Sequence, residues 1–115
     1  MQPNPTDVPL IRLVVVPEKC HGARIRTIGF VRFEFEGDVI YPHREDYDHA
    51  LVGNGIWIEV TGKLRSRHKE LSMKYCLVEG IFDAKQRGHF GMWSGTIKNI
   101  TRFQIWSDPA RPQNR

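Results

Sequence analysis

Long apolar runs and disulfide-forming cysteines are both scarce in this sequence of 115 residues. No apolar run approaches the ~20 residues that a helix needs to span a bilayer. The two cysteines, Cys20 and Cys76, are fewer than a small disulfide-stapled secreted domain usually carries, so we expect both to be reduced and partly buried. The first residues contain no basic segment followed by a signal-peptide core, which predicts a cytoplasmic protein.

Motifs for the common catalytic and metal-binding chemistries are also missing. The five histidines are scattered, and the adjacent Cys20 and His21 have no CxxC partner, so we expect no metal. The serine in Gly91-Met92-Trp93-Ser94-Gly95 stands one place late for GxSxG, and no GxxxxGK[ST] loop is present. Cys76 falls on an apolar strand face, where a cysteine is typical of a core. We therefore expect a protein that is not an enzyme and has no cofactor.

The composition that remains is that of one ordinary globular domain. Apolar residues make up 40% and charged residues 26%, which excludes a disordered chain. The 17 Lys and Arg against 13 Asp and Glu give a net charge of +4, which permits an anionic partner but equally fits a slightly basic solvated surface. Proline spacing predicts an extended arm over residues 1–9, a domain over 10–106 and a flexible tail over 107–115.

Apolar residues alternate with a period of two along most of that domain, which is typical of β-strands. Within 24–36 the odd positions indicate a core face and the even positions a mostly polar face, and the central Gly29 predicts a bulge or a sharp bend. Near Ile100 the alternation slips, which predicts a bulge. The predicted strands cover residues 10–16, 24–36, 39–41, 55–60, 74–84 and 96–106.

The only predicted helix lies over residues 43–52. Tyr47 and Leu51 share one helical face, and the early acids Glu45, Asp46 and Asp48 suit a helix N-terminus. Residues 61–72 are polar and basic, which indicates a loop or a short helical turn. Five or six strands and one short α-helix in this length predict an all-β fold, a small barrel that hides its strand edges.

Two segments resemble small bacterial OB-fold domains, including those similar to the tRNA-anticodon-binding OB fold. They are Cys20-His21-Gly22-Ala23-Arg24-Ile25-Arg26-Thr27-Ile28-Gly29 and Lys74-Tyr75-Cys76-Leu77-Val78-Glu79-Gly80. The stretch 77–102 also looks like a set of uncharacterised bacterial single-domain proteins. The resemblance implies a five-stranded OB-like barrel that binds a ligand on one face and through its rim loops. The usual OB helix follows the third strand, whereas the helix predicted here follows the second.

The loop over residues 85–95 is the first candidate binding site. Its cations could contact phosphates while its aromatic rings stack on bases, which is worth about 1–3 kcal/mol per base. The alternative is that the rings fold back and cap the barrel. The candidate residues are Lys85, Arg87, His89, Phe90 and Trp93.

The even face of the first long strand is the second candidate. Alternating arginines with one aromatic would form a cationic stripe suited to bidentate contacts with phosphate. Its residues are Arg24, Arg26, Phe30 and Arg32. The alternative is a half-exposed surface in which these arginines pair with acids, among them Glu34, Glu36, Glu79 and Asp83.

A third candidate is the basic run between residues 63 and 74, which could steer a polyanion but is equally typical of a solvated loop. Its cations are Lys63, Arg65, Arg67, His68, Lys69 and Lys74. Each of Trp57, Trp93 and Trp106 could anchor a partner. Packing at the barrel ends is the alternative for at least two of these tryptophans.

Two functions follow from these features. The first is a non-catalytic OB-fold binding module for single-stranded nucleic acid or another polyanion. The second is a protein-interaction module, such as an immunity or inhibitor protein that masks a partner, with the acidic residues of 43–52 as the contact. Neither involves a membrane. The ligand's identity, the oligomeric state and the open face of the barrel stay undetermined at this point.

Overall fold

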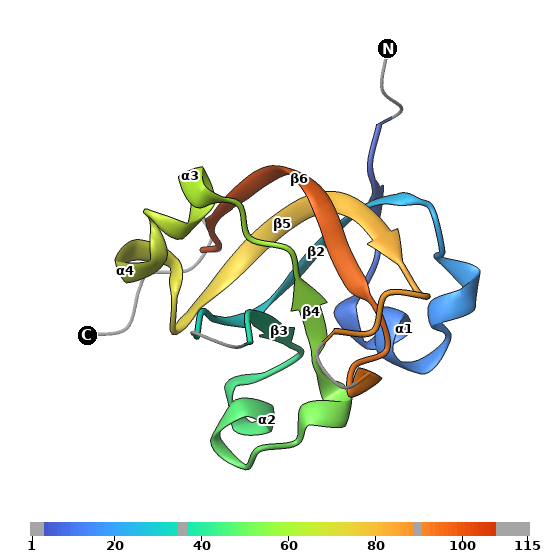
Figure 1. Cartoon of the computed structure of the whole chain (residues 1–115), viewed down its shortest axis with the longest axis horizontal. Helices are drawn as coiled ribbons and strands as arrows, with labels where there is room; N and C mark the ends of the chain where they lie inside the picture. The colour runs from blue at the N-terminus through green and yellow to red at the C-terminus, as the bar shows by residue number, and fades with distance from the viewer. Residues whose placement is uncertain (1–3, 35–36, 89–90, 108–115) are drawn as a thin grey trace.

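The computed structural model describes residues 4–34, 37–88 and 91–107 (Figure 1). The strands in these ranges are β1 (Thr6–Asp7), β2 (Arg24–Arg32), β3 (Val39–Tyr41), β4 (Ile56–Ile58), β5 (Lys74–Asp83) and β6 (Thr96–Ile105). The α-helices are α1 (Leu10–Val15), α2 (Arg44–Asp48), α3 (Gly62–Arg65) and α4 (His68–Leu71). Two short 3₁₀ helices, η1 (Pro17–Lys19) and η2 (Val52–Asn54), complete the assignment.

Five of these strands close into a barrel in the order β2-β3-β4-β6-β5, because β2 also pairs with β5. The β4–β6 pairing is parallel and the other barrel pairings are antiparallel. The short β1 adds a parallel strand to β2. The prediction of a small all-β OB-like barrel is confirmed. Barrel closure hides the strand edges, as expected.

The barrel core is built from the strand faces that the alternation predicts. On β2, Ile25, Thr27 and Val31 are buried, and Phe33 just beyond the strand is buried with them. Gly29 is required there by close approach: a Cβ at this position would lie 2.6 Å from the carbonyl oxygen of Tyr41. The register of β2 with β5 stays regular through Gly29, so the predicted bulge does not occur there, and the glycine instead permits the close approach of β3.

The later strands also follow their predicted ranges closely. β3, β4, β5 and β6 correspond to the predicted segments 39–41, 55–60, 74–84 and 96–106. The pairing of β5 with β6 shifts register between Glu79 and Ile81, and Asn99 has a φ of 50°. This irregularity confirms the bulge predicted near Ile100.

The predicted strand over residues 10–16 is wrong, because Leu10–Val15 form helix α1. Leu10 and Leu13 are buried at a helical spacing, whereas Ile11 and Val15 are exposed. A short apolar run fits a strand or a helix equally well, and here the packing of two leucines against the barrel selects the helix. The arm before it contributes β1 to the sheet.

The expectation of one short helix is also too low. The predicted helix over 43–52 is shortened to α2, whose capping box joins His43 and Asp46, and is followed by η2. The segment 61–72 forms α3 and α4, which Figure 1 shows on the far side of the barrel from α1. Helices therefore follow both the second and the third barrel strands.

Several remaining expectations concern the ends and the thiols. Cys20 and Cys76 are both free and buried, as predicted. Burial raises the pKa of the Cys76 thiol to about 12, so it stays protonated at neutral pH. No helix in the described part of the chain is long and apolar enough to cross a membrane. Phe35, Glu36 and most of the predicted tail lie outside the described residues.

Candidate functional site

The loop between β5 and β6 begins at Asp83, whose carboxylate makes several hydrogen bonds. One carboxylate oxygen of Asp83 accepts the backbone N–H groups of Lys85 at 2.9 Å and Gln86 at 3.2 Å, and the other accepts from Lys98 Nζ at 2.9 Å. The Lys98 hydrogen bond and these backbone donors lower the pKa of Asp83 to about 2. The Asp83 charge is therefore balanced by Lys98, and the carboxylate fixes the direction in which the loop leaves β5.

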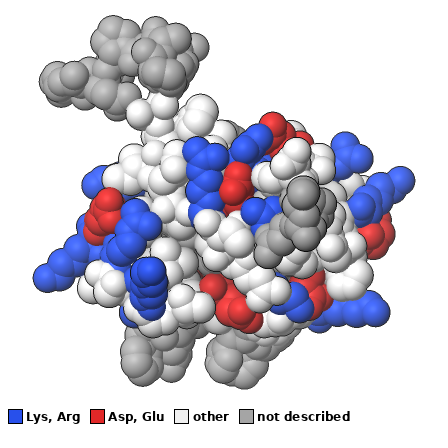
Figure 2. All heavy atoms as spheres, turned by 90° about the horizontal axis from the view of Figure 1, so that it is seen from above, with Lys and Arg blue, Asp and Glu red and all other residues white. Residues whose placement is uncertain are grey.

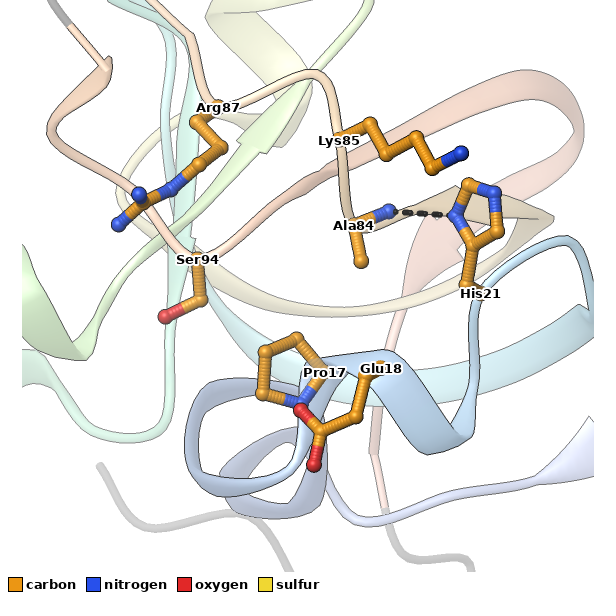
Figure 3. A pocket seen from close by; sticks show the side chains of 7 residues that line it. All are labelled: Pro17, Glu18, His21, Ala84, Lys85, Arg87 and Ser94. Atoms are coloured by element: carbon orange, nitrogen blue, oxygen red, sulfur yellow. Dashed lines mark hydrogen bonds between the residues drawn. The ribbon is translucent and has the colours of Figure 1, made fainter.

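His21, in the turn before β2, holds the start of the same loop at the same end of the barrel. His21 Nδ1 accepts the backbone N–H of Ala84 at 3.0 Å, drawn as the dashed line in Figure 3. Because Nδ1 acts as an acceptor, the proton of the neutral ring is on Nε2. Thr96 Oγ1 also donates to the carbonyl oxygen of Gln86. The first residues of the loop are thus anchored by three different segments of the chain.

A cleft of about 440 Å³ opens beside the base of this loop. Figure 3 shows the Lys85 side chain reaching toward His21 at one end of the cleft and Arg87 beside Ser94 at the other. Glu18 lies across the cleft with Pro17. Among the described residues, no carboxylate lies within salt-bridge distance of Lys85 or Arg87. Neither loop cation is therefore ion-paired within the described part of the chain.

Arg87 also connects the cleft to an aromatic groove on the other side of the loop. Its Nε donates to the carbonyl oxygen of Trp93 at 2.9 Å. Trp93 lines a groove of about 280 Å³ together with Tyr41, Tyr47 and Arg32. The loop thus borders the cationic cleft on one side and, through Trp93, the groove with Tyr41 and Tyr47 on the other.

Trp93 is packed rather than free. It is 7% exposed, lies 4.7 Å from Trp57 between ring centroids, and packs with Val39 and Tyr41. Gly88, with a φ of 73°, makes this packing possible, since a Cβ there would lie 2.5 Å from the Trp93 ring. The structure therefore shows the capping alternative for Trp93. The other two predicted loop residues, His89 and Phe90, lie outside the described residues.

The arginines of β2 are engaged within the protein. Arg26 binds Asp7 at 2.6 Å and Glu79 at 3.1 Å, and these bonds raise its pKa. Arg32 binds Glu34 at 3.0 Å and lies over the Tyr47 ring. Arg24 donates to the Thr101 hydroxyl at 2.9 Å. The structure thus shows the paired-surface alternative for this stripe.

The predicted cationic stripe needed Phe30 on an open face, but Phe30 is covered. It is 2% exposed, with Tyr47 and Tyr75 rings packed against it at 6.0 and 5.4 Å between centroids, and Arg44 over its ring. The expectation that Phe30 is accessible is wrong because α2 packs over the end of β2. The alternation of β2 alone could not reveal that cover.

Charges elsewhere on the surface are similarly mixed. Figure 2 shows Lys and Arg interspersed with Asp and Glu on the face it presents. In the basic run, Arg65 binds Asp38 and Arg67 binds Glu70, so part of that charge is balanced. In the acidic segment, Asp46 accepts from Asn54 and from the backbone of His43, and Asp48 binds Arg44.

His21 and Glu18 are the cleft residues that the sequence did not single out as binding residues. His21 and Ala84 are 63 positions apart, and no local pattern announces their contact. In the described ranges, no three His, Cys, Asp or Glu side chains gather as metal ligands would. No protein-family model matches the chain, and no curated protein matches it.

Proposed function

We propose that this protein is a non-catalytic binding module for single-stranded nucleic acid, with the β5–β6 loop as its contact. The observation that carries the proposal is the pair of loop cations, Lys85 and Arg87, which have no acidic partner among the described residues. The arginines Arg26 and Arg32 of β2 do have such partners. A cation without an internal partner binds phosphate without breaking an existing ion pair.

The anchored base of the loop supports this assignment. Asp83, His21 and Thr96 hold the backbone of residues 84–86, so the Lys85 side chain projects from a fixed position. Binding groups that are already held in place lose less conformational entropy when the ligand binds. Loops on a rigid barrel are common binding elements for this reason.

The two walls of the cleft suggest how a strand would lie. Phosphates would contact Lys85 and Arg87 at one wall, and base edges would face Glu18 at the other. Glu18, across the cleft, would repel a phosphate and accept hydrogen bonds from base amino groups. The cleft thus has one wall for the backbone and one for base edges.

We also propose a cytoplasmic location, where the buried thiols of Cys20 and Cys76 stay reduced. The competing function, a protein-interaction module contacted through the acidic helix, has less support. Asp46 and Asp48 are already bonded to groups within the protein. A basic partner would therefore have to displace these internal contacts.

Fluorescence anisotropy with labelled single-stranded DNA and RNA tests the proposal. We expect micromolar binding at about 50 mM salt that weakens at about 200 mM, because phosphate contacts release counterions. A duplex of the same sequence is the matched control, and its binding should be weaker because its bases are inaccessible. Absence of single-strand binding at the lower salt would overturn the proposal.

A further inference from the structure

The outer face of β2, β5 and β6 carries a regular grid of side chains. The pairing register places Arg26 beside Glu79 and Glu79 beside Arg102 in one row. The next row places Ile28 beside Leu77. Beyond it lie Tyr75 and Trp106, whose backbone N–H donates to the Tyr75 carbonyl at 2.9 Å. The grid therefore has a charged row and an adjoining apolar area.

The apolar area groups three partly exposed large side chains on one face of the sheet. Ile28, Tyr75 and Trp106 are 38%, 39% and 41% exposed. Ile28, Trp106 and the more buried Leu77 line one hollow of about 520 Å³, together with Val8 and Pro9. Single exposed apolar residues are ordinary, but a contiguous group with a polar border is typical of an interface.

The charged row alternates in sign across four neighbouring strands. Asp7 on β1, Arg26 on β2, Glu79 on β5 and Arg102 on β6 are joined by contacts of 2.6, 3.1 and 3.5 Å. A two-fold rotation about an axis parallel to the strands reverses this order. The exposed Asp7 of one copy then faces the exposed Arg102 of the other, and apolar area faces apolar area, while Glu79, which is 7% exposed, stays paired with Arg26 and Arg102 of its own copy. The grid is self-complementary in both charge and polarity.

We propose that this face binds a second copy of the chain in a two-fold symmetric dimer. The driving force is burial of Ile28, Tyr75 and Trp106, and the alternating charged row sets the alignment. The β5–β6 loop lies about 20 Å along β5 from Leu77, so dimerisation leaves the cleft open. The proposal is independent of nucleic-acid binding, since it uses other residues and another measurement.

Sedimentation velocity of the full chain from about 1 to 200 µM tests the dimer by mass action. We expect the apparent mass to rise from one chain toward two. Over the same range the total tryptophan emission, to which the half-exposed Trp106 contributes, should shift to shorter wavelength. Ile28→Glu should remain monomeric because it places a charge in the apolar area. Val15→Glu is the matched control, because Val15 is a 67% exposed apolar residue on α1, and it should dimerise normally.

A second variant keeps the test valid if Ile28→Glu folds poorly. Trp106 lies just beyond the end of β6, so replacing it should leave the fold intact. We expect the Trp106→Ser variant to dimerise more weakly while its circular dichroism spectrum stays unchanged. Arg102→Glu, tested as a separate variant, should also weaken the dimer, most strongly at low salt, because it breaks the alternation of charges along the row. A chain that stays monomeric at all concentrations would overturn the proposal and leave the face to a different protein. A dimer that survives both Ile28→Glu and Trp106→Ser would overturn it as well.

Discussion

The even face of β2 and the β5–β6 loop look alike in sequence, since each interleaves basic with aromatic residues, yet they differ in the folded protein. On β2, Arg26 is bonded to Asp7 and Glu79, and Phe30 is covered by α2. In the loop, the side chains of Lys85 and Arg87 form no salt bridge with a described residue. The difference arises because a strand inside a sheet has neighbours on both sides, whereas a loop leaves the sheet.

Position relative to the sheet therefore decides whether a cation is available. Strand pairing brings cross-strand side chains to within about 5 Å, which is close enough for an ion pair. The register of β2 places Arg26 opposite acids on both of its neighbours, Asp7 on β1 and Glu79 on β5. The four expected outcomes that follow test this difference between strand and loop.

The largest effect is expected from Gly88→Ala in the loop. The new Cβ would lie 2.5 Å from Trp93 and force a positive φ on alanine, so we expect a loss of about 2–4 kcal/mol in the free energy of unfolding. Gly91→Ala is the matched control, since Gly91 also has a positive φ but no atom within 4 Å, and it should cost about 1–2 kcal/mol. Chemical denaturation measures both, and equal losses would show that the Trp93 contact is unimportant.

The next effect is on binding. The double variant Lys85→Ala/Arg87→Ala should lower single-strand affinity about tenfold at low salt and reduce the salt slope by about 1.4, because two phosphate contacts are lost. Arg26→Ala, which also removes a basic side chain, should leave the affinity nearly unchanged. If Arg26→Ala weakens binding as much as the loop variant, the strand rather than the loop is the contact.

For the free energy of unfolding, the strand variant should have the larger effect and the loop variant the smaller one. Arg26→Gln should lower the free energy of unfolding, because the buried Glu79 carboxylate loses its nearest cation and keeps only Arg102 at 3.5 Å. Lys85→Gln should leave stability nearly unchanged, since the Lys85 ammonium is bonded to no described residue. Thermal unfolding of the two variants measures the difference, and similar midpoints would contradict the distinction between strand and loop.

The smallest effect concerns pH and the base of the loop. The pKa of Asp83 is about 2 in the folded protein against a usual 3.8, so the folded state binds fewer protons at this site than the unfolded chain. Its contribution to stability is complete above about pH 4 and is lost as the pH falls toward 2. Urea unfolding across this range should show a shallower pH dependence for Asp83→Asn. The shifts at Asp7 and Glu70, in the same direction, should keep some dependence in the variant.

Local pattern was sufficient for the barrel strands and for part of the site. The alternation along β2 predicts the face that carries Ile25, Thr27 and Val31, because it depends on residues adjacent in sequence. Lys85 and Arg87 are two positions apart and fall in one loop whatever the fold. Local pattern gave the wrong structure for residues 10–15, because their few apolar positions fit the period of a strand and that of a helix equally well.

Contacts between distant segments lie beyond local pattern. The period of apolar residues follows from short-range stereochemistry. The alternating strands and the position of the loop cations can therefore be predicted from the sequence alone. The bond from His21 to Ala84, the cover of α2 over Phe30 and the pairing of Arg26 with Asp7 join residues from different elements. These partners meet because the barrel closes at one register, and that register depends on the free energy of the whole core rather than of any one segment.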